Sequence, residues 1–186
     1  MHQTRLDERG FTLAEVLVAM LILTTGAMAA AGLFILSAAS IRAAAAETQS
    51  TLLASAKMEQ LQSLLWSYDD AGAPVSDMST DLSVDPASVG GGGLRPSPVD
   101  ALNRNCPGYV DYLDATGRWV GSGPAPPPQA AYVRRWNIQP LANTSDVLVL
   151  QVVATTVVRD ALRPPAGTVS AGPDALLVAL RIREAR

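Results

Sequence analysis

Glu15 is the side chain whose type and position most need a chemical explanation. It is the only charged residue between Arg9 and Arg42, so the stretch from Val16 through Ile41 carries no charge. An ionised carboxylate at the centre of a membrane-length apolar helix costs about 2.5–3.5 kcal/mol on insertion scales. Such a group is expected to bind an opposite charge, and the sequence therefore predicts a cationic partner for Glu15.

The rest of the sequence offers no recognisable catalytic, cofactor-binding or metal-ligating set. The single histidine, His2, lies in the polar leader, and the chain has no phosphate-binding glycine loop, serine-hydrolase motif or Cys/His cluster. Asp77, Asp81 and Asp85 lack the ligand spacing of a known calcium loop. We therefore expect a protein without enzymatic activity or cofactors, and we assign no metal site.

The residues around Glu15 form a distinctive string. A polar leader, residues 1–10, ends in Gly10, and the next residues read F-T-L-A-E-V-L-V-A from Phe11 onward. This string resembles the N-terminal signal of type IV prepilins and of type II secretion pseudopilins. The alternative is an ordinary signal anchor in which the Gly-Phe pair and the glutamate are accidental.

The resemblance implies a role for each of three residues. A membrane-embedded prepilin peptidase cuts after Gly10 and methylates the new amino terminus at Phe11. Glu15 stays in the mature helix and pairs with the N-terminal ammonium of a neighbouring subunit during assembly. Two opposite charges about 4 Å apart attract by about 4 kcal/mol at an effective dielectric constant of about 20. This attraction is comparable with the cost of inserting the carboxylate.

Within this family the chain is most like minor pilins of the PilV type. The similarity lies in the run from Val16 to Gly26 and in the later sequence A-K-M-E-Q-L at residues 56–61. It implies a structural or initiation subunit of a type IV pilus. A minor pseudopilin of a type II secretion system, similar to the I component, is the alternative, and a membrane-anchored binding module or enzyme is a third. The sequence does not separate the first two.

Composition limits the remaining classes. The 186 residues carry 14 Lys and Arg against 17 Asp and Glu, and no basic patch with interleaved aromatic residues indicates nucleic-acid binding. Cys106 is the single cysteine, so an intrachain disulfide is excluded. The partners that the resemblance implies are prepilin peptidase, the inner membrane, and other pilin or pseudopilin subunits through the N-terminal helix.

Helix-forming residues continue beyond the apolar stretch, with no Gly or Pro between Arg42 and Trp66. We expect one helix whose first half, residues 11–41, crosses the membrane and whose amphipathic second half, residues 42–66, packs on a sheet. Residues 67–108 are rich in Gly, Pro and Asp and are expected to form a variable loop region. The stripe expected to contact the sheet consists of Leu53, Ala56, Leu61 and Leu64.

The C-terminal region, residues 109–186, is expected to form an antiparallel sheet. Strand patterns occur in residues 109–113, 118–120, 131–139, 147–158 and 175–183. The third of these is expected to carry an outward arginine beside an inward Trp136. The last alternates, and its inward side chains are expected to be Leu176, Val178, Leu180 and Ile182. The fold class is therefore α+β and pilin-like, with a long N-terminal α-helix packed on a C-terminal antiparallel β-sheet.

The apolar stretch also indicates where the protein resides. It is longer than the apolar segment of a cleavable signal, which has about 7–15 residues. It is long enough to span a bilayer, which requires about 20 residues. Residues 43–46 nevertheless offer small side chains for signal-peptide cleavage, which would leave a terminus near Glu47. The leader holds both basic and acidic residues, so its charge alone does not fix the orientation. The resemblance implies one inner-membrane span, a cytoplasmic leader and a periplasmic globular domain, which enters a pilus or pseudopilus after assembly.

Overall fold

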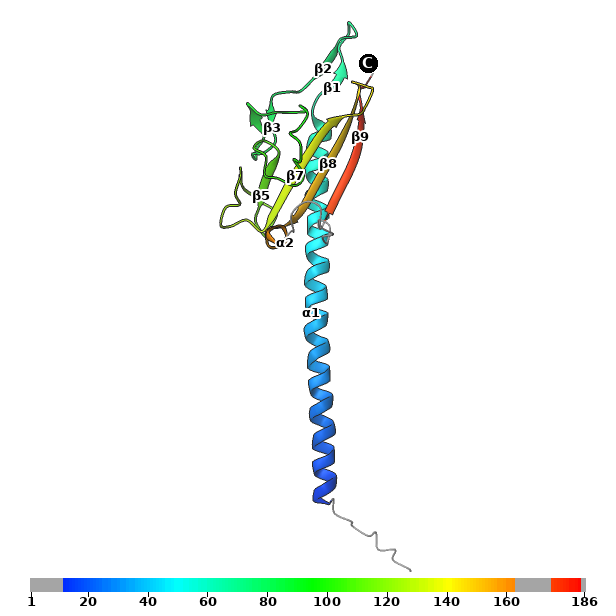
Figure 1. The fold of residues 1–186 in the computed structure, drawn as a ribbon, viewed down its shortest axis with the longest axis vertical. Coiled ribbons are helices and arrows are strands. Elements are labelled where there is room, and N and C mark those ends of the chain that lie inside the picture. Colours follow the sequence, from blue (N-terminus) through cyan, green and yellow to red (C-terminus); the bar gives the residue numbers. More distant parts are fainter. Residues whose placement is uncertain (1–11, 163–174, 185–186) are drawn as a thin grey trace, which may run out of the picture. The chain divides into compact units, whose positions relative to one another are not determined.

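A computed structural model of the chain describes residues 12–162 and 175–184. The chain consists of two compact units, Met1–Ala44 and Ala45–Arg186, and each is treated by itself. A long N-terminal helix is followed by short hairpins and then by a five-stranded antiparallel sheet (Figure 1). The expected α+β, pilin-like fold class is confirmed.

The elements have these bounds. The helices are α1 (Leu13–Ser63) and α2 (Val157–Ala161). The main sheet contains β5 (Val110–Leu113), β6 (Trp119–Ser122), β7 (Tyr132–Pro140), β8 (Val147–Thr156) and β9 (Ala175–Ile182). Two hairpins, β1 (Trp66–Tyr68) with β2 (Pro74–Ser76) and β3 (Thr80–Asp81) with β4 (Ser88–Val89), occupy the region expected to be variable loop. Trp66, expected to lie in the helix, begins β1 instead.

The described part of the N-terminal unit is helical, and its side chains are all exposed. Leu13 is 80 % exposed and Ile41 is 66 % exposed, and no residue between them is buried. A helix that is apolar on every side requires an apolar environment, either a protein core or lipid. Among the described residues, α1 is the helix that is long and apolar enough to cross a membrane.

The main sheet has the strand order β6-β5-β7-β8-β9, and every neighbouring pair is antiparallel. The longest ladder joins β7 to β8, from Tyr132 opposite Thr156 to Pro140 opposite Leu148. Leu150 and Val152 on β8 are fully buried. The expected hairpin at residues 109–120 is β5 and β6, and the expected β-branched strand is β8.

The C-terminal part of α1 packs against one face of this sheet. Leu53 and Leu61 are buried in a core that also contains Trp136, Ile138 and Leu150. The expected contact stripe is therefore confirmed for these two leucines. Leu64 is half-buried against the core.

The expected position of Ala56 in the stripe is wrong, because this side chain is exposed. The buried positions in this part of the helix are Ser50, Leu53, Ala54, Lys57, Met58 and Leu61. They follow the three-to-four-residue spacing of one helical face. The inward position next to Ala56 is occupied by Lys57, although an apolar side chain would be expected at a buried position.

Lys57 is buried because it belongs to an ion network between α1 and the sheet. Its Nζ lies 2.8 Å from Oδ2 of Asp111 and donates to the carbonyl oxygen of Leu82 at 2.6 Å. Arg134 donates to both oxygens of the same carboxylate, at 2.9 and 2.7 Å. Lys57 also lies 4.5 Å from the centroid of the Trp136 ring. Burial lowers the pKa of Lys57, and the Asp111 carboxylate opposes that effect.

The expected outward arginine on β7 is Arg135, which lies on the face opposite Trp136, but its side chain is buried instead of exposed. Arg134 is also buried, on the same face as Trp136. On the face away from α1, Arg135 forms paired hydrogen bonds with Asp160 at 2.7 Å and also donates to Asn105. Each guanidinium is therefore satisfied by a carboxylate, which is the condition for burying a charge.

The expected inward face of β9 is wrong as well. Leu176, Val178, Leu180 and Ile182 are exposed, whereas Leu177 and Ala179 pack against the core. Arg181 shares their inward face and donates to the carbonyl oxygens of Leu61, at 2.7 Å, and of Leu64. Carbonyl groups at a helix C-terminus lack partners within the helix. By binding them, Arg181 fixes which face of β9 points inward, since a one-residue shift would reverse every side chain.

The glycine run between β4 and β5 permits close backbone contact. A Cβ atom added to Gly91 would lie 2.2 Å from Cα of Asp81, and one added to Gly93 would lie 2.4 Å from the carbonyl oxygen of Asp77. Gly93 also has a φ of 52°, which favours glycine. The run therefore packs closely against β3 and the segment before it.

Candidate assembly site at the start of α1

Glu15 and Thr12 form a reciprocal cap at the first turn of α1. The Glu15 Oε2 atom accepts hydrogen bonds from the backbone N–H and the hydroxyl of Thr12, both at 2.8 Å. In return, the backbone N–H of Glu15 donates to Thr12 Oγ1 at 3.3 Å. This arrangement is a capping box, in which the N-cap residue and the third helical residue satisfy each other's free N–H groups.

The cap leaves part of the Glu15 carboxylate available. Both bonds from Thr12 end on Oε2, and the described residues provide no partner for Oε1. Glu15 is exposed, and no other described residue before Arg42 is charged. The carboxylate can therefore accept a cation from another molecule through Oε1 while Oε2 continues to hold the helix terminus.

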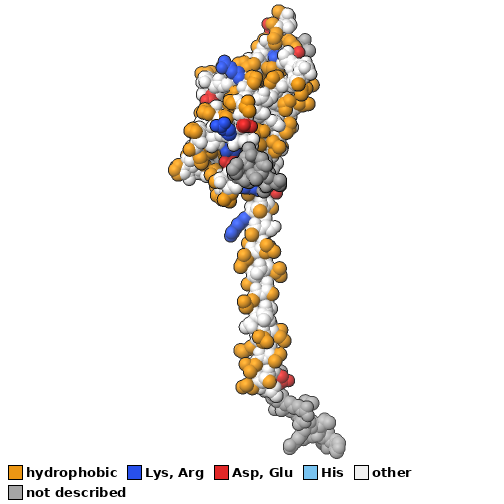
Figure 2. All heavy atoms as spheres, in the orientation of Figure 1, with side chains coloured by type: hydrophobic (Ala, Val, Ile, Leu, Met, Phe, Trp, Pro, Cys, Tyr) orange, Lys and Arg blue, Asp and Glu red, His pale blue; other side chains and the backbone are white. Residues whose placement is uncertain are grey.

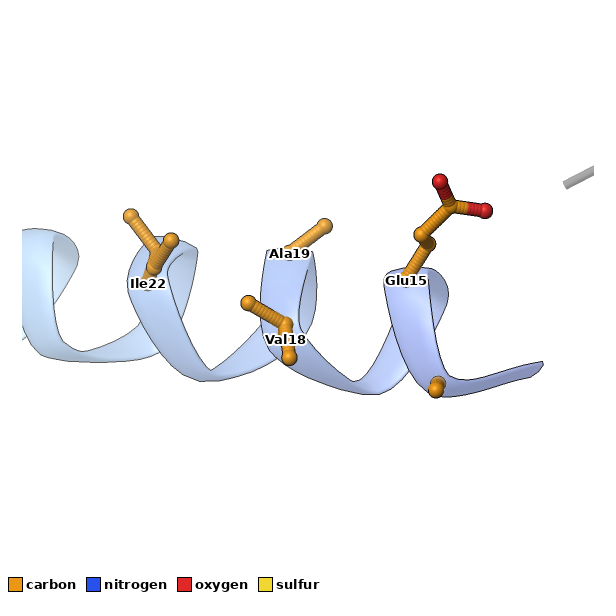
Figure 3. A pocket seen from close by; sticks show the side chains of 5 residues that line it. Glu15, Val18, Ala19 and Ile22 are labelled. Carbon is orange, nitrogen blue, oxygen red and sulfur yellow. The ribbon is translucent and has the colours of Figure 1, made fainter. Parts of the chain in front are cut away.

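The helix surface beside Glu15 is apolar and shallow. Ala14, Val18, Ala19 and Ile22 line an open hollow together with Glu15. In Figure 3 the Glu15 carboxylate stands at one end of this surface, and Val18, Ala19 and Ile22 follow it along the helix. The side chains of the two alanines are small, so another apolar helix can approach this side closely.

The remaining site predictions are placed as follows. Gly10 and Phe11, the two processing residues, lie outside the described residues, so cleavage between them stays a prediction. Glu15 lies in the first turn of α1, and its role in assembly stays a prediction. Thr12 was missed as a functional residue, although its signal is readable: Thr followed three residues later by Glu, ahead of an apolar run, is the sequence signature of a capping box.

Apolar side chains continue from this first turn along the whole exposed length of the N-terminal unit. Figure 2 shows hydrophobic groups along the visible side of the helix, with an acidic group near its start. Leu17, Leu21 and Phe34 are each at least 60 % exposed. Among the described residues from Thr12 to Ile41, the Glu15 carboxylate is therefore the only charged group that can meet a neighbouring molecule in an apolar medium.

No second site emerges from the described residues. They contain no cluster of three or more metal-ligating side chains. The Asp77 carboxylate instead accepts bonds from Ser79 and Thr80, and the Asp81 carboxylate accepts bonds from Ser83. Cys106 carries a free, half-buried thiol.

Comparison with known proteins identifies the first segment alone. Residues 5–31 match the family described as the prokaryotic N-terminal methylation motif. Neither the curated proteins nor the solved structures contain a match to the chain. The matched segment includes Gly10, Phe11, Thr12 and Glu15, and it supports a protein of the type IV prepilin or pseudopilin type.

Proposed function

We propose that this chain is a minor type IV pilin, a structural or initiation subunit that prepilin peptidase processes and that enters the filament through its N-terminal helix. The observation that carries the proposal is the state of Glu15. It is a lone carboxylate at the first turn of an exposed apolar helix, it follows a methylation motif, and its Oε1 atom is open to a cation.

Cleavage after Gly10 would supply the cation. The new terminus at Phe11 carries an ammonium group, and methylation leaves its positive charge in place. A neighbouring subunit that brings this ammonium to Oε1 of Glu15 gains about 4 kcal/mol for charges about 4 Å apart at an effective dielectric constant of about 20. The same pairing fixes the axial position of one helix against the next.

The capping box supports this mechanism at the step before assembly. A subunit that waits in the membrane has no neighbour, and its carboxylate would be costly there. The two hydrogen bonds from Thr12 partly satisfy Oε2 in the isolated chain. Glu15 is thus tolerated in the unassembled subunit and gains its full partner in the filament.

In this proposal the protein spans the inner membrane once, with its leader in the cytoplasm and residues 45–186 in the periplasm. The alternative is a minor pseudopilin of a type II secretion system, similar to the I component, because the motif is common to both classes. Neighbouring genes distinguish them: a pilus assembly ATPase and retraction motor favour the pilus, whereas a secretin with secretion-system partners favours the pseudopilus.

Processing is tested by mass spectrometry of the N-terminal peptide from membrane-extracted protein. We expect a methylated Phe11 at the terminus. A terminus near Glu47 would identify an ordinary signal peptide and would refute the proposal.

The role of the charge is tested by two matched substitutions. Glu15→Gln keeps an oxygen that can accept the bonds from Thr12 but removes the charge, and Thr12→Val removes the capping hydroxyl but keeps the charge. We expect Glu15→Gln to remain processed in the membrane and to be depleted from sheared filaments, with Thr12→Val much less depleted. Wild-type incorporation of Glu15→Gln would show that the capping geometry suffices and that charge pairing is wrong.

A further inference from the structure

β9 is an edge strand, and one of its two sides has no strand of the main sheet beside it (Figure 1). Antiparallel partners alternate between pairs that exchange both backbone hydrogen bonds and pairs that exchange none. The N–H of Arg183 donates to the carbonyl oxygen of Asp146 at 2.7 Å, so the odd-numbered residues of β9 bond to β8. The even-numbered residues therefore direct their backbone groups to the free edge: Leu176, Val178, Leu180 and Ile182.

The free edge of β9 is a row of unused donors and acceptors. Within the part of the chain that the structure describes, no group bonds to the N–H or C=O of these four residues. Their side chains are between 51 and 68 % exposed. The backbone groups recur about every 7 Å along the edge, the repeat of two residues in a strand. An extended polypeptide carries donors and acceptors in the same alternation, and such an edge is a template for another strand.

Glu184, the next even-numbered residue, shows this edge accepting a strand. Its N–H donates to the carbonyl oxygen of Trp66 at 3.3 Å, and its carbonyl oxygen accepts from the N–H of Tyr68 at 3.2 Å. The two segments form a parallel bridge between Ser67 and Glu184. The chain thus begins a sixth strand beyond the C-terminal end of β9 and leaves the rest of the edge open.

The core is also incomplete beside the free edge. On the inward face of the sheet, Leu150 of β8 is fully buried and Trp136 of β7 is 1 % exposed. Leu177 and Ala179 of β9 share that face but are only half-buried against the core. A strand added beyond β9 would cover these side chains with its own inward residues, as neighbours on one face of a sheet do. The edge therefore offers apolar contact as well as hydrogen bonds.

The two edges of the main sheet differ in how they are protected. Proteins block edge pairing with short strands, bulges, outward charges or proline. At one edge, β6 has four residues, and its register with β5 shifts at a bulge. At the other, β9 has eight residues without proline, and its one charged side chain, Arg181, binds carbonyl groups of α1. The free edge of β9 is the one suited to accept a strand.

We propose that the free edge of β9 binds a short extended segment of another polypeptide, which becomes the sixth strand of the sheet. In this mode, main-chain hydrogen bonds provide affinity and alternate side chains provide specificity. The segment is apolar on the side that meets Leu177 and Ala179, and it ends beside Ile182 because Trp66 occupies the next position. The inference uses only residues of the C-terminal unit and does not rest on the proposed function.

A second copy of β9 fits this edge less well than a separate short segment. Antiparallel pairing of two β9 strands would bring the start of each strand against residues 66–68 of the other copy. Those residues already occupy the position beside Glu184. A short strand from a different chain can end before this position and still pair along all four even-numbered residues.

Amide hydrogen exchange, followed by NMR residue by residue, tests the inference on the full chain in lipid nanodiscs. The probe is a peptide of alternating Val and Thr, about as long as β9 and flanked by lysines. In the free chain, the even-numbered amides of β9 should exchange quickly and the odd-numbered ones slowly, because only the latter bond to β8. At a peptide concentration of about ten times Kd, exchange of the even-numbered amides should slow by about tenfold.

Two matched controls separate backbone pairing from side-chain contact. The fully N-methylated peptide has the same side chains and no backbone donors, so it should leave the exchange unchanged. In the protein, Val178→Pro removes an outward N–H at a position where an edge strand tolerates proline, whereas Val178→Thr keeps that N–H. We expect Val178→Pro to weaken peptide binding by at least about tenfold and Val178→Thr to stay close to wild type. Slow exchange of the Leu177 and Ala179 amides verifies that the ladder with β8 persists.

Several results would overturn the inference. Slow exchange of the even-numbered amides without peptide would show that the edge is closed within the chain, or by a second copy if the slowing depends on chain concentration. Equal effects of the methylated and unmethylated peptides would indicate apolar contact without strand pairing. Failure of the peptide to slow exchange, or equal binding by Val178→Pro and Val178→Thr, would also refute strand addition at β9.

Discussion

Asp111→Asn should be among the most damaging single substitutions in the globular unit, although it barely changes the size of the side chain. The carboxylate lies 2.8 Å from Lys57 and 2.7 Å from Arg134, and all three side chains are at least 93 % buried. An asparagine in its place would leave two buried cations beside a neutral amide. Breaking a buried pair by removing one partner typically costs about 3–5 kcal/mol.

This cost is a large share of the stability that a domain of this kind has. Folded domains are stable by about 5–15 kcal/mol, so Asp111→Asn should remove a substantial fraction of the unit's free energy of unfolding. The assay is urea unfolding of residues 45–186 followed by tryptophan fluorescence, because Trp136 stacks on Lys57. Glu59→Gln, an exposed charge removal on α1, is the matched control and should stay within about 0.5 kcal/mol of wild type.

A second substitution in the same network tests whether Lys57, Arg134 and Asp111 act together. Lys57→Met in the Asp111→Asn background removes one of the two unpaired cations and should recover part of the lost stability. The two changes are therefore expected to be strongly non-additive. If Asp111→Asn costs no more than Glu59→Gln, or if Lys57→Met adds its full separate cost, the buried network does not couple α1 to the sheet and the argument fails.

Two further predictions concern the core and the pH dependence. Leu61→Ala should lower the free energy of unfolding by about 2–5 kcal/mol because its side chain is fully buried, whereas the exposed Gln62→Ala should be near neutral; similar urea midpoints for the two would contradict docking of α1 on the sheet. Burial alone would raise the pKa of Asp77, but hydrogen bonds from Thr80 and Ser79 outweigh it and hold that pKa below its usual value. The pKa of Asp77 is lower in the folded state than in the unfolded state, so its ionised form stabilises the fold. This contribution is complete above the unfolded-state pKa of about 3.9 and is lost as the pH falls through the folded-state pKa. Asp77→Asn should therefore lose less stability than wild type between pH 5 and pH 2, as equilibrium unfolding at each pH will show.

The parts of the fold that sequence reasoning could predict are those set by long periodic patterns. The apolar run after Thr12 predicts α1, and the β-branched run in residues 147–158 predicts β8, because length and composition favour one structure there. The strand ends at Thr156, and Val157 and Val158 begin α2 instead. The processing motif is equally local, so the family resemblance and the importance of Glu15 could be inferred from adjacent residues.

The errors arose where distant residues decide the outcome. Both faces of β9 are rich in aliphatic side chains, so alternation cannot choose between Leu176 and Leu177 as the inward residue. The choice depends on Arg181, whose partners are carbonyl groups 120 and 117 residues earlier in the chain. Lys57 presents the same problem, since nothing near it in the sequence announces that Asp111 will neutralise it.

The clamp that β9 forms on the end of α1 also has a consequence for the order of biosynthesis. Arg181 binds the helix terminus, and Glu184 pairs with the backbone on either side of Ser67. Arg181 lies 120 residues after Leu61, so the helix leaves the ribosome well before the strand that binds it. The globular unit cannot close until β9 has been synthesised, and contacts this distant in the sequence make closure slow. Until then the apolar edge of β8 is bare, so a chain truncated before β9 should be a substrate for proteolysis instead of a functional subunit.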